Sequence, residues 1–121
     1  MQKKRILVIE DDDMSREGVA EVLTDEGYEV MVACNGAEGL AMLPLCHPDL
    51  VLTDLHMPKL NGWGVVTHLK QTYPTMPVII FTSDIEIDAK REMQKLGVQD
   101  FVNKPLDLND LIRRVKNVLT L

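Results

Sequence analysis

Five short apolar segments alternate along this chain with five longer amphipathic ones, and this alternation restricts the fold more than any other feature. The apolar segments, which we expect to form strands, are Arg5–Ile9, Glu29–Ala33, Leu50–Thr53, Val78–Thr82 and Asp100–Val102. The amphipathic segments, which we expect to form helices, lie near Met14–Glu26, Gly36–Leu43, Gly62–Gln71, Ile87–Leu96 and Leu108–Leu119. Strands that alternate with helices of this length pair in parallel, with helices on both faces of the sheet and right-handed crossovers. The sequence therefore predicts a doubly wound α/β domain.

The last of these segments has the clearest helical periodicity. Its apolar residues recur at i, i+3, i+4 and i+7, as on one face of a helix. These residues are Leu108, Leu111, Ile112, Val115, Val118 and Leu119. Either Asp107 or Asn109 is suited to cap its start. Gly27 and Gly97 stand where the first and fourth helices should end, as left-handed stop residues do.

Charge and composition exclude several classes of function. The chain has 121 residues, 45% of them hydrophobic, which suits one core and leaves little room for a second. Its formal net charge of −6 disfavours direct binding to nucleic acid or to an anionic membrane. No apolar stretch approaches the ~20 residues of a membrane span. Cys34 and Cys46 form neither a CxxC pair nor a metal-ligand spacing, which is typical of a reducing compartment. We therefore expect a cytoplasmic protein with one domain over residues 1–121 and no output domain within the chain.

Polar side chains stand where four of the expected strands end. Asp54 closes the third strand, Glu10 and Asp11 follow the first, Thr82 ends the fourth and Lys104 follows the fifth. In an open α/β sheet, ligands bind at the carboxyl ends of the strands. One acidic cluster, one aspartate, one hydroxyl and one lysine at a single sheet edge indicate a phosphoryl-accepting site.

The acidic residues Glu10, Asp11 and Asp54 predict a metal ion. Two carboxylates about 4 Å apart repel by roughly 4 kcal/mol at an effective dielectric constant of about 20. Bringing three together is therefore costly unless a cation lies between them, and hard oxygen ligands suit Mg²⁺. For Asp12 and Asp13 we favour a simpler interpretation, in which they stabilise the start of the following helix through its dipole.

Thr82 and Lys104 are weak signals when each is taken alone. A threonine in this position is an ordinary β-branched strand residue, and a lysine before a proline is most often a surface residue. Their functional interpretation is that the hydroxyl and the ammonium group both contact a phosphoryl oxygen, because lysine acts as a compact point charge toward phosphate. The order of all these residues, each at a strand end, makes the combined signal strong.

Four motifs together resemble the response-regulator receiver domain of two-component signalling, over essentially the whole chain from Ile6 to Leu119. They are Ile-Leu-Val-Ile-Glu-Asp-Asp (6–12), Leu-Thr-Asp-Leu-His-Met-Pro-Lys-Leu-Asn-Gly (52–62), Val-Ile-Ile-Phe-Thr-Ser (78–83) and Phe-Val-Asn-Lys-Pro-Leu (101–106). The resemblance implies a flavodoxin-like fold with strand order 2-1-3-4-5.

The resemblance also implies roles for the strand-end residues. Asp54 would accept a phosphoryl group from a sensor histidine kinase or a phosphotransfer protein, and Thr82 and Lys104 would contact that group. The ligands of Mg²⁺, for which Mn²⁺ could substitute, would be Glu10, Asp11, Asp54 and the main-chain carbonyl of His56. Glu10 departs from the family's commoner aspartate, and the longer side chain would reach metal-bound water.

A second departure concerns the expected switch, formed by Thr82 and Phe101. Phe101 takes an aromatic position often held by tyrosine, so the hydrogen bond of a tyrosine hydroxyl is lost. A static core aromatic is the simpler interpretation of Phe101. The resemblance favours a switch that changes the face formed by Ile87–Leu96, Asp100–Asn103 and Leu108–Leu119. That face would control a downstream protein or a fused output domain. It could also form a homodimer, because its mixed charges could pair across a two-fold axis.

Two other classes of function fit less well. A Mg²⁺-dependent phosphatase of the haloacid dehalogenase type needs a second aspartate two residues after the nucleophile, where this chain has His56. A flavin carrier needs a hydroxyl- or glycine-rich loop after the first strand, where residues 10–13 are acidic and would repel phosphate. The expected receiver domain catalyses only its own phosphoryl transfer and dephosphorylation, so we do not expect a turnover enzyme.

Overall fold

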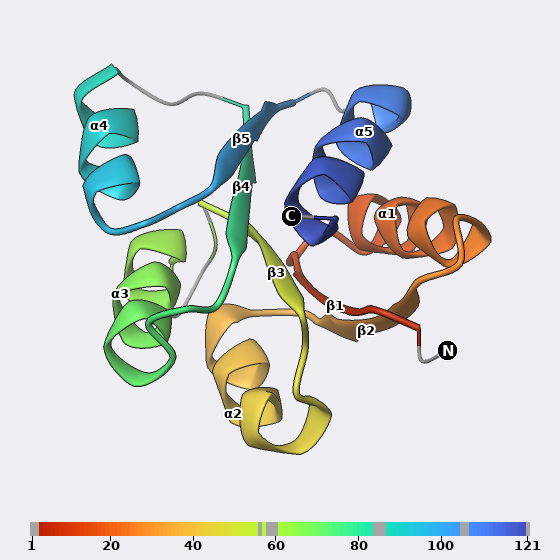
Figure 1. The fold of residues 1–121 in the computed structure, drawn as a ribbon, viewed down its shortest axis with the longest axis horizontal. Coiled ribbons are helices and arrows are strands. Elements are labelled where there is room, and N and C mark those ends of the chain that lie inside the picture. The colour runs from red at the N-terminus through yellow and green to blue at the C-terminus, as the bar shows by residue number, and fades with distance from the viewer. Residues whose placement is uncertain (1–2, 56, 58–60, 84–86, 105–106, 121) are drawn as a thin grey trace.

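The computed structural model describes residues 3–55, 57, 61–83, 87–104 and 107–120, which contain five parallel strands in one sheet (Figure 1). The strands are β1 (Arg5–Ile9), β2 (Glu29–Ala33), β3 (Leu50–Asp54), β4 (Val78–Thr82) and β5 (Asp100–Asn103). The helices are α1 (Asp13–Asp25), α2 (Gly36–Cys46), α3 (Gly62–Thr72), α4 (Ile87–Lys95) and α5 (Leu108–Leu119). The order in the sheet is β2-β1-β3-β4-β5, so the predicted (βα)5 fold with strand order 2-1-3-4-5 is confirmed.

Helices cover both faces of the sheet. Figure 1 shows α1 and α5 on one side, and α2, α3 and α4 on the other. Successive strand residues point to opposite faces, so Ile6 and Val8 pack with the α1–α5 layer while Leu7 and Ile9 pack with the opposite layer. Every residue of the central strands β3 and β4 is buried. Burial on both faces explains why these strands are continuous apolar runs rather than alternating ones.

Local signals for the helix ends agree with the structure. Asp107, rather than Asn109, caps α5, because its carboxylate accepts hydrogen bonds from the main-chain N–H groups of Asn109 and Asp110. Gly27 and Gly97 both have φ of +98°, the left-handed conformation expected after a helix. These turns reverse the chain toward β2 and β5.

The prediction that the second helix ends at Leu43 is wrong. Helix α2 continues through Pro44 to Cys46 and ends at His47, which has φ of +46°. Proline removes one helical hydrogen bond, but tertiary contacts hold the last turn: Leu43 is buried, and the Arg5 guanidinium donates to the Cys46 carbonyl over 3.1 Å.

Other boundaries differ from the predictions by a single residue. Helix α1 begins and ends one residue earlier, α3 is one residue longer and α4 one shorter. Strands β3 and β5 each extend by one residue, to Asp54 and Asn103. Shifts of this size are usual at the ends of elements. They move no expected site residue away from the carboxyl edge of the sheet.

Candidate functional site

The strand register brings the carboxyl ends of four strands to one edge of the sheet. Ile9 of β1 lies opposite Thr53 of β3, so Glu10 and Asp54 follow side by side. On the other side, Asp54 lies opposite Phe81 of β4, and Thr82 lies opposite Asn103 of β5. The register therefore places Glu10, Asp54 and Thr82 at this edge, whereas Phe101 lies further back in β5, opposite Ile80.

Lys104 connects two of the predicted acidic residues. Its Nζ donates to Glu10 Oε1 and to Asp54 Oδ2, each over 2.8 Å. Glu10 is completely buried and Asp54 is 5% exposed, while the Lys104 side chain is 22% exposed. The main-chain N–H of Lys104 donates to the Thr82 carbonyl over 2.9 Å, which anchors this residue beside β4. The ammonium group thus offsets the repulsion between two carboxylates that come from different strands.

Glu10, Asp11 and Asp54 form an acidic cluster in which one carboxylate oxygen of each lies within 4.8 Å of the others. Glu10 Oε2 is buried and has no hydrogen-bond partner among the residues that the structure describes. A buried carboxylate oxygen without a partner is costly, and a cation at the cluster would satisfy it. Three hard oxygen donors therefore fit Mg²⁺, which coordinates few protein carboxylates and keeps several waters. The predicted fourth ligand, the carbonyl of His56, lies outside the described residues.

The surroundings of Glu10 raise its pKa to about 7, from an ordinary value of 4.5. Burial is the main cause, since it disfavours the charged form, and a hydrogen bond with Asp54 adds to it. Lys104 opposes both effects. For Lys104 itself, burial would lower the pKa, but the hydrogen bonds to Asp54 and Glu10 outweigh it, so its pKa is raised. A bound divalent cation would favour the carboxylate form of Glu10.

The predicted switch residues lie on neighbouring strands, Thr82 at the end of β4 and Phe101 within β5. Thr82 is 1% exposed, and its hydroxyl oxygen is buried without a hydrogen-bond partner in the described part of the chain. A hydroxyl in this condition can donate to an incoming phosphoryl oxygen. Phe101 is 8% exposed and packs on the α4 side of the sheet. The Lys90 ammonium group lies 5.3 Å from the centroid of its ring.

Asp12 and Asp13 stabilise the start of α1, as the simpler interpretation predicts. The Asp12 carboxylate accepts a hydrogen bond from the Ser15 N–H over 2.9 Å, which lowers the pKa of this carboxyl group. Asp13 lies in the first turn and pairs with Arg16. Of the four acidic residues at positions 10–13, only Glu10 and Asp11 join the cluster with Asp54.

Two residues that the sequence did not single out support the site. Arg16 donates from its guanidinium to the main-chain carbonyl of Glu10 over 2.9 Å, a contact that a lone arginine in a first helical turn does not reveal. Gly62 allows α3 to approach β3 closely: a Cβ there would lie 2.6 Å from the Asp54 carbonyl oxygen and 2.7 Å from Leu55 Cα.

Comparisons with known proteins agree with this geometry. The response regulator receiver domain family matches residues 6–116. The chain is 36% identical over 119 residues, 98% of its length, to the "Probable transcriptional regulator ycf27" of Porphyridium aerugineum. It covers 49% of that relative, and it spans about half the length of the first curated relatives it matches.

Solved structures share the whole fold. The receiver domain of HemR from Leptospira biflexa aligns with a TM-score of 0.93 at 28% identity, over 98% of this chain and 96% of that one. The chemotaxis protein CheY4 of Vibrio cholerae aligns with a TM-score of 0.92 at 26% identity, over 97% and 99% of the two chains. None of the helices in the described residues is long and apolar enough to cross a membrane.

Receiver domains are signalling domains that interact with histidine kinases and output domains, and an acidic pocket for Mg²⁺ and an aspartyl phosphate are typical of them. The match over residues 6–116, the shared fold and the acidic cluster lead to one conclusion. This chain belongs to the response regulator receiver domain family of two-component signalling.

Proposed function

We propose that Asp54 is the phosphoacceptor of a Mg²⁺-dependent phosphorelay. The observation that carries this proposal is the position of Asp54: its carboxylate ends β3 beside Glu10 and Asp11, and the Lys104 ammonium group lies 2.8 Å from its Oδ2. A carboxylate oxygen of Asp54 attacks the phosphorus of a phosphohistidine on a sensor kinase or phosphotransfer protein. The P–N bond breaks, its electron pair returns to the imidazole, and an aspartyl phosphate forms.

The residues around Asp54 have different roles in this transfer. Glu10, Asp11 and Asp54 would hold Mg²⁺, or Mn²⁺ in its place, together with the predicted carbonyl of His56. The bound metal would offset the negative charge of the phosphoryl oxygens. Lys104 and the Thr82 hydroxyl contact the transferred group, because each carries a donor at the same sheet edge. Hydrolysis of the aspartyl phosphate ends the signal, and the domain turns over no separate substrate.

Phosphodonor labelling tests this proposal directly. Incubation of the chain with acetyl phosphate and Mg²⁺ should add one phosphoryl group, as measured by intact mass. Asp54→Asn should abolish the mass increase, whereas Asp25→Asn, which changes an exposed carboxylate at the end of α1, should leave it unchanged. Undiminished labelling of the Asp54→Asn variant would show that the phosphoacceptor is wrongly assigned.

The proposed output face consists of α4, β5 and α5, and Thr82 and Phe101 form the proposed switch. Two positions in the sheet support this: Thr82 lies opposite Asn103 in the β4–β5 register, and Phe101 of β5 packs on the α4 side of the sheet. Movement of Thr82 toward a phosphoryl group would leave space that Phe101 can fill, and phosphorylation would bias two conformers that are close in energy. The partner is a downstream protein or an output domain of a longer regulator.

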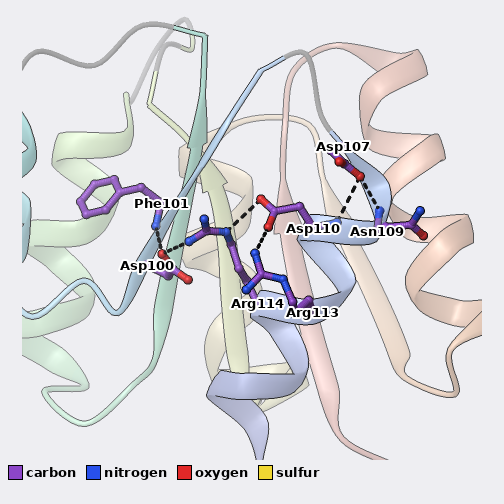
Figure 2. Close-up of polar contacts among 7 residues, drawn as sticks. All are labelled: Asp100, Phe101, Asp107, Asn109, Asp110, Arg113 and Arg114. Carbon is purple, nitrogen blue, oxygen red and sulfur yellow. Dashed lines mark hydrogen bonds and ion pairs between the residues drawn. The ribbon is translucent and has the colours of Figure 1, made fainter.

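A homodimer through this face would have to replace ion pairs within the chain. Figure 2 shows that Arg114 bonds to both Asp100 and Asp110, and that Arg113 bonds to Asp110. Beryllofluoride should change the hydrogen-exchange protection of residues 87–119, and light scattering decides whether this face also forms a homodimer. Changes confined to the surroundings of Asp54 would contradict the proposed face. The proposal further includes one receiver domain over residues 1–121 that makes no direct contact with nucleic acid. The cytoplasmic location stays a prediction.

A further inference from the structure

We propose that Arg16 is a positioning residue for the metal site, because it holds the peptide unit that joins Glu10 to Asp11. This inference rests on the proposed function in one respect, that Glu10, Asp11 and Asp54 hold a divalent cation. Arg16 lies in the first turn of α1, and one guanidinium nitrogen donates to the main-chain oxygen of Glu10 over 2.9 Å. Its side chain is 15% exposed, although arginines in a first helical turn are usually solvated.

The Glu10 carbonyl needs a donor because of its place in the chain. Strand β1 ends at Ile9, and the N–H of Glu10 still donates to the Ala33 carbonyl at the end of β2, over 3.1 Å. The carbonyl of Glu10 lies one step beyond the sheet ladder, and Arg16 supplies its hydrogen bond. The Glu10 residue is therefore fixed at its N–H by β2 and at its C=O by α1.

Fixing this carbonyl restricts the position of Asp11. The C=O of Glu10 and the N–H of Asp11 belong to one planar peptide unit, so the chain has no freedom of rotation between them. A hydrogen bond that holds this plane fixes the positions of the Asp11 N and Cα atoms, so that only φ and the side-chain torsions of Asp11 still decide where its carboxylate lies. The carboxylates of Glu10 and Asp11 then lie within 4.8 Å of that of Asp54 before a cation binds. Binding therefore costs little conformational entropy for these ligands.

Because Arg16 is charged, the direction in which its removal changes metal affinity tests this inference. A positive charge near a cation site weakens cation binding by repulsion, and the ion pair with Asp13 offsets only part of it. If Arg16 acted through its charge alone, removing it would tighten metal binding. If it acts by holding the Glu10–Asp11 peptide, removing it weakens metal binding.

The experiment measures the Kd of Mn²⁺ from the free ion detected by electron paramagnetic resonance. Arg16→Ala should raise the Kd by about 10-fold, the lower end of the effect of residues that orient metal ligands. Arg16→Lys, which keeps one charged donor, should restore part of the affinity. Arg113→Ala is the matched control, because Arg113 also pairs with an aspartate three residues earlier in its helix and its loss changes the net charge equally. That control should leave the Kd unchanged.

Further variants separate this inference from the proposed function. Asp11→Asn should abolish Mn²⁺ binding if the metal site is correct, and retained binding would overturn both proposals. If Asp11→Asn loses binding but Arg16→Ala binds as tightly as the parent or more tightly, the metal site stands and the positioning role is wrong. An equal loss in Arg113→Ala would also overturn the positioning role. Should Arg16→Ala fail to fold, Arg16→Gln replaces it with the same criteria.

Discussion

The Nζ atom of Lys104 lies 2.8 Å from Oδ2 of Asp54, so the proposed phosphoacceptor is already paired with a cation. The same ammonium group reaches Glu10, and it lies 5.2 Å from the centroid of the Phe81 ring beneath it. Lys104 therefore has two tasks that a phosphoryl contact alone would not require. It bridges two carboxylates that burial has brought together and offsets their repulsion, and its hydrogen bond holds the Asp54 carboxylate in place.

Replacing Lys104 by methionine should destabilise the metal-free protein. Methionine keeps the packing over Phe81 but leaves the carboxylates of Glu10 and Asp54 without their shared cation. The loss should be about 1–3 kcal/mol, below the value for a fully buried pair, because solvent reaches part of the ammonium group. Urea denaturation in chelator measures it. Lys95→Met is the control, since its ion pair with Glu92 is exposed and should contribute little. Equal stability of the Lys104→Met variant and the parent would contradict this account.

The stability of the metal-free protein should depend on the protonation of Glu10. Its pKa is about 7 in the folded state and near 4.5 when unfolded, so the folded state binds the proton more tightly. This contribution is fully present below the unfolded pKa and is lost as the pH rises through the folded pKa. In chelator, Glu10→Gln should therefore lose less stability than the parent between about pH 5 and about pH 8. Denaturation curves at both values measure the difference, and parallel behaviour of the two proteins would refute the prediction.

Gly62 and Gly18 should respond oppositely to alanine. A Cβ at Gly62 would lie 2.6 Å from the Asp54 carbonyl oxygen, a backbone atom that cannot yield easily, so Gly62→Ala should cost about 1–3 kcal/mol. It should also slow phosphodonor labelling, because the backbone that carries Asp54 must shift. At Gly18 in α1 no heavy atom lies within 4 Å of the added methyl group apart from the adjacent residues and the backbone of the helix itself, so Gly18→Ala should stabilise by up to about 1 kcal/mol. Urea denaturation compares them, and a stabilised Gly62→Ala variant would show that the close approach is not required.

Lys90 should contribute modestly to the position of Phe101. Its ammonium group lies 5.3 Å from the ring centroid, and an exposed cation–π contact contributes about 0.5–1 kcal/mol. Lys90→Met should lower the free energy of unfolding by this amount and increase amide exchange in β5. Lys90→Arg should keep the stability and the β5 amide protection of the parent. Thermal denaturation and hydrogen exchange provide the two measurements. If Lys90→Met matches the parent in both, the contact does not hold the ring.

The sequence by itself determined the elements and the edge at which the site forms. Alternating apolar and amphipathic segments, helix caps such as Asp107 and the stop residue Gly97 are local signals, because each depends on residues within a turn or two. The continuous apolar run before Asp54 showed that β3 is buried on both faces, and this placed the aspartate at its carboxyl end. The strand order came from resemblance to a family rather than from periodicity.

Only the tertiary structure decided which of these groups meet. Lys104 reaches Glu10 across 94 residues of chain, and Arg16 finds the Glu10 carbonyl because α1 packs back over β1. The last turn of α2, which follows Pro44, is likewise held by Arg5 of β1, which is 41 residues away from Cys46 in the sequence. Periodicity reports which face of an element is apolar, but not the register between elements. Contacts between polar side chains therefore follow from packing, which sets that register.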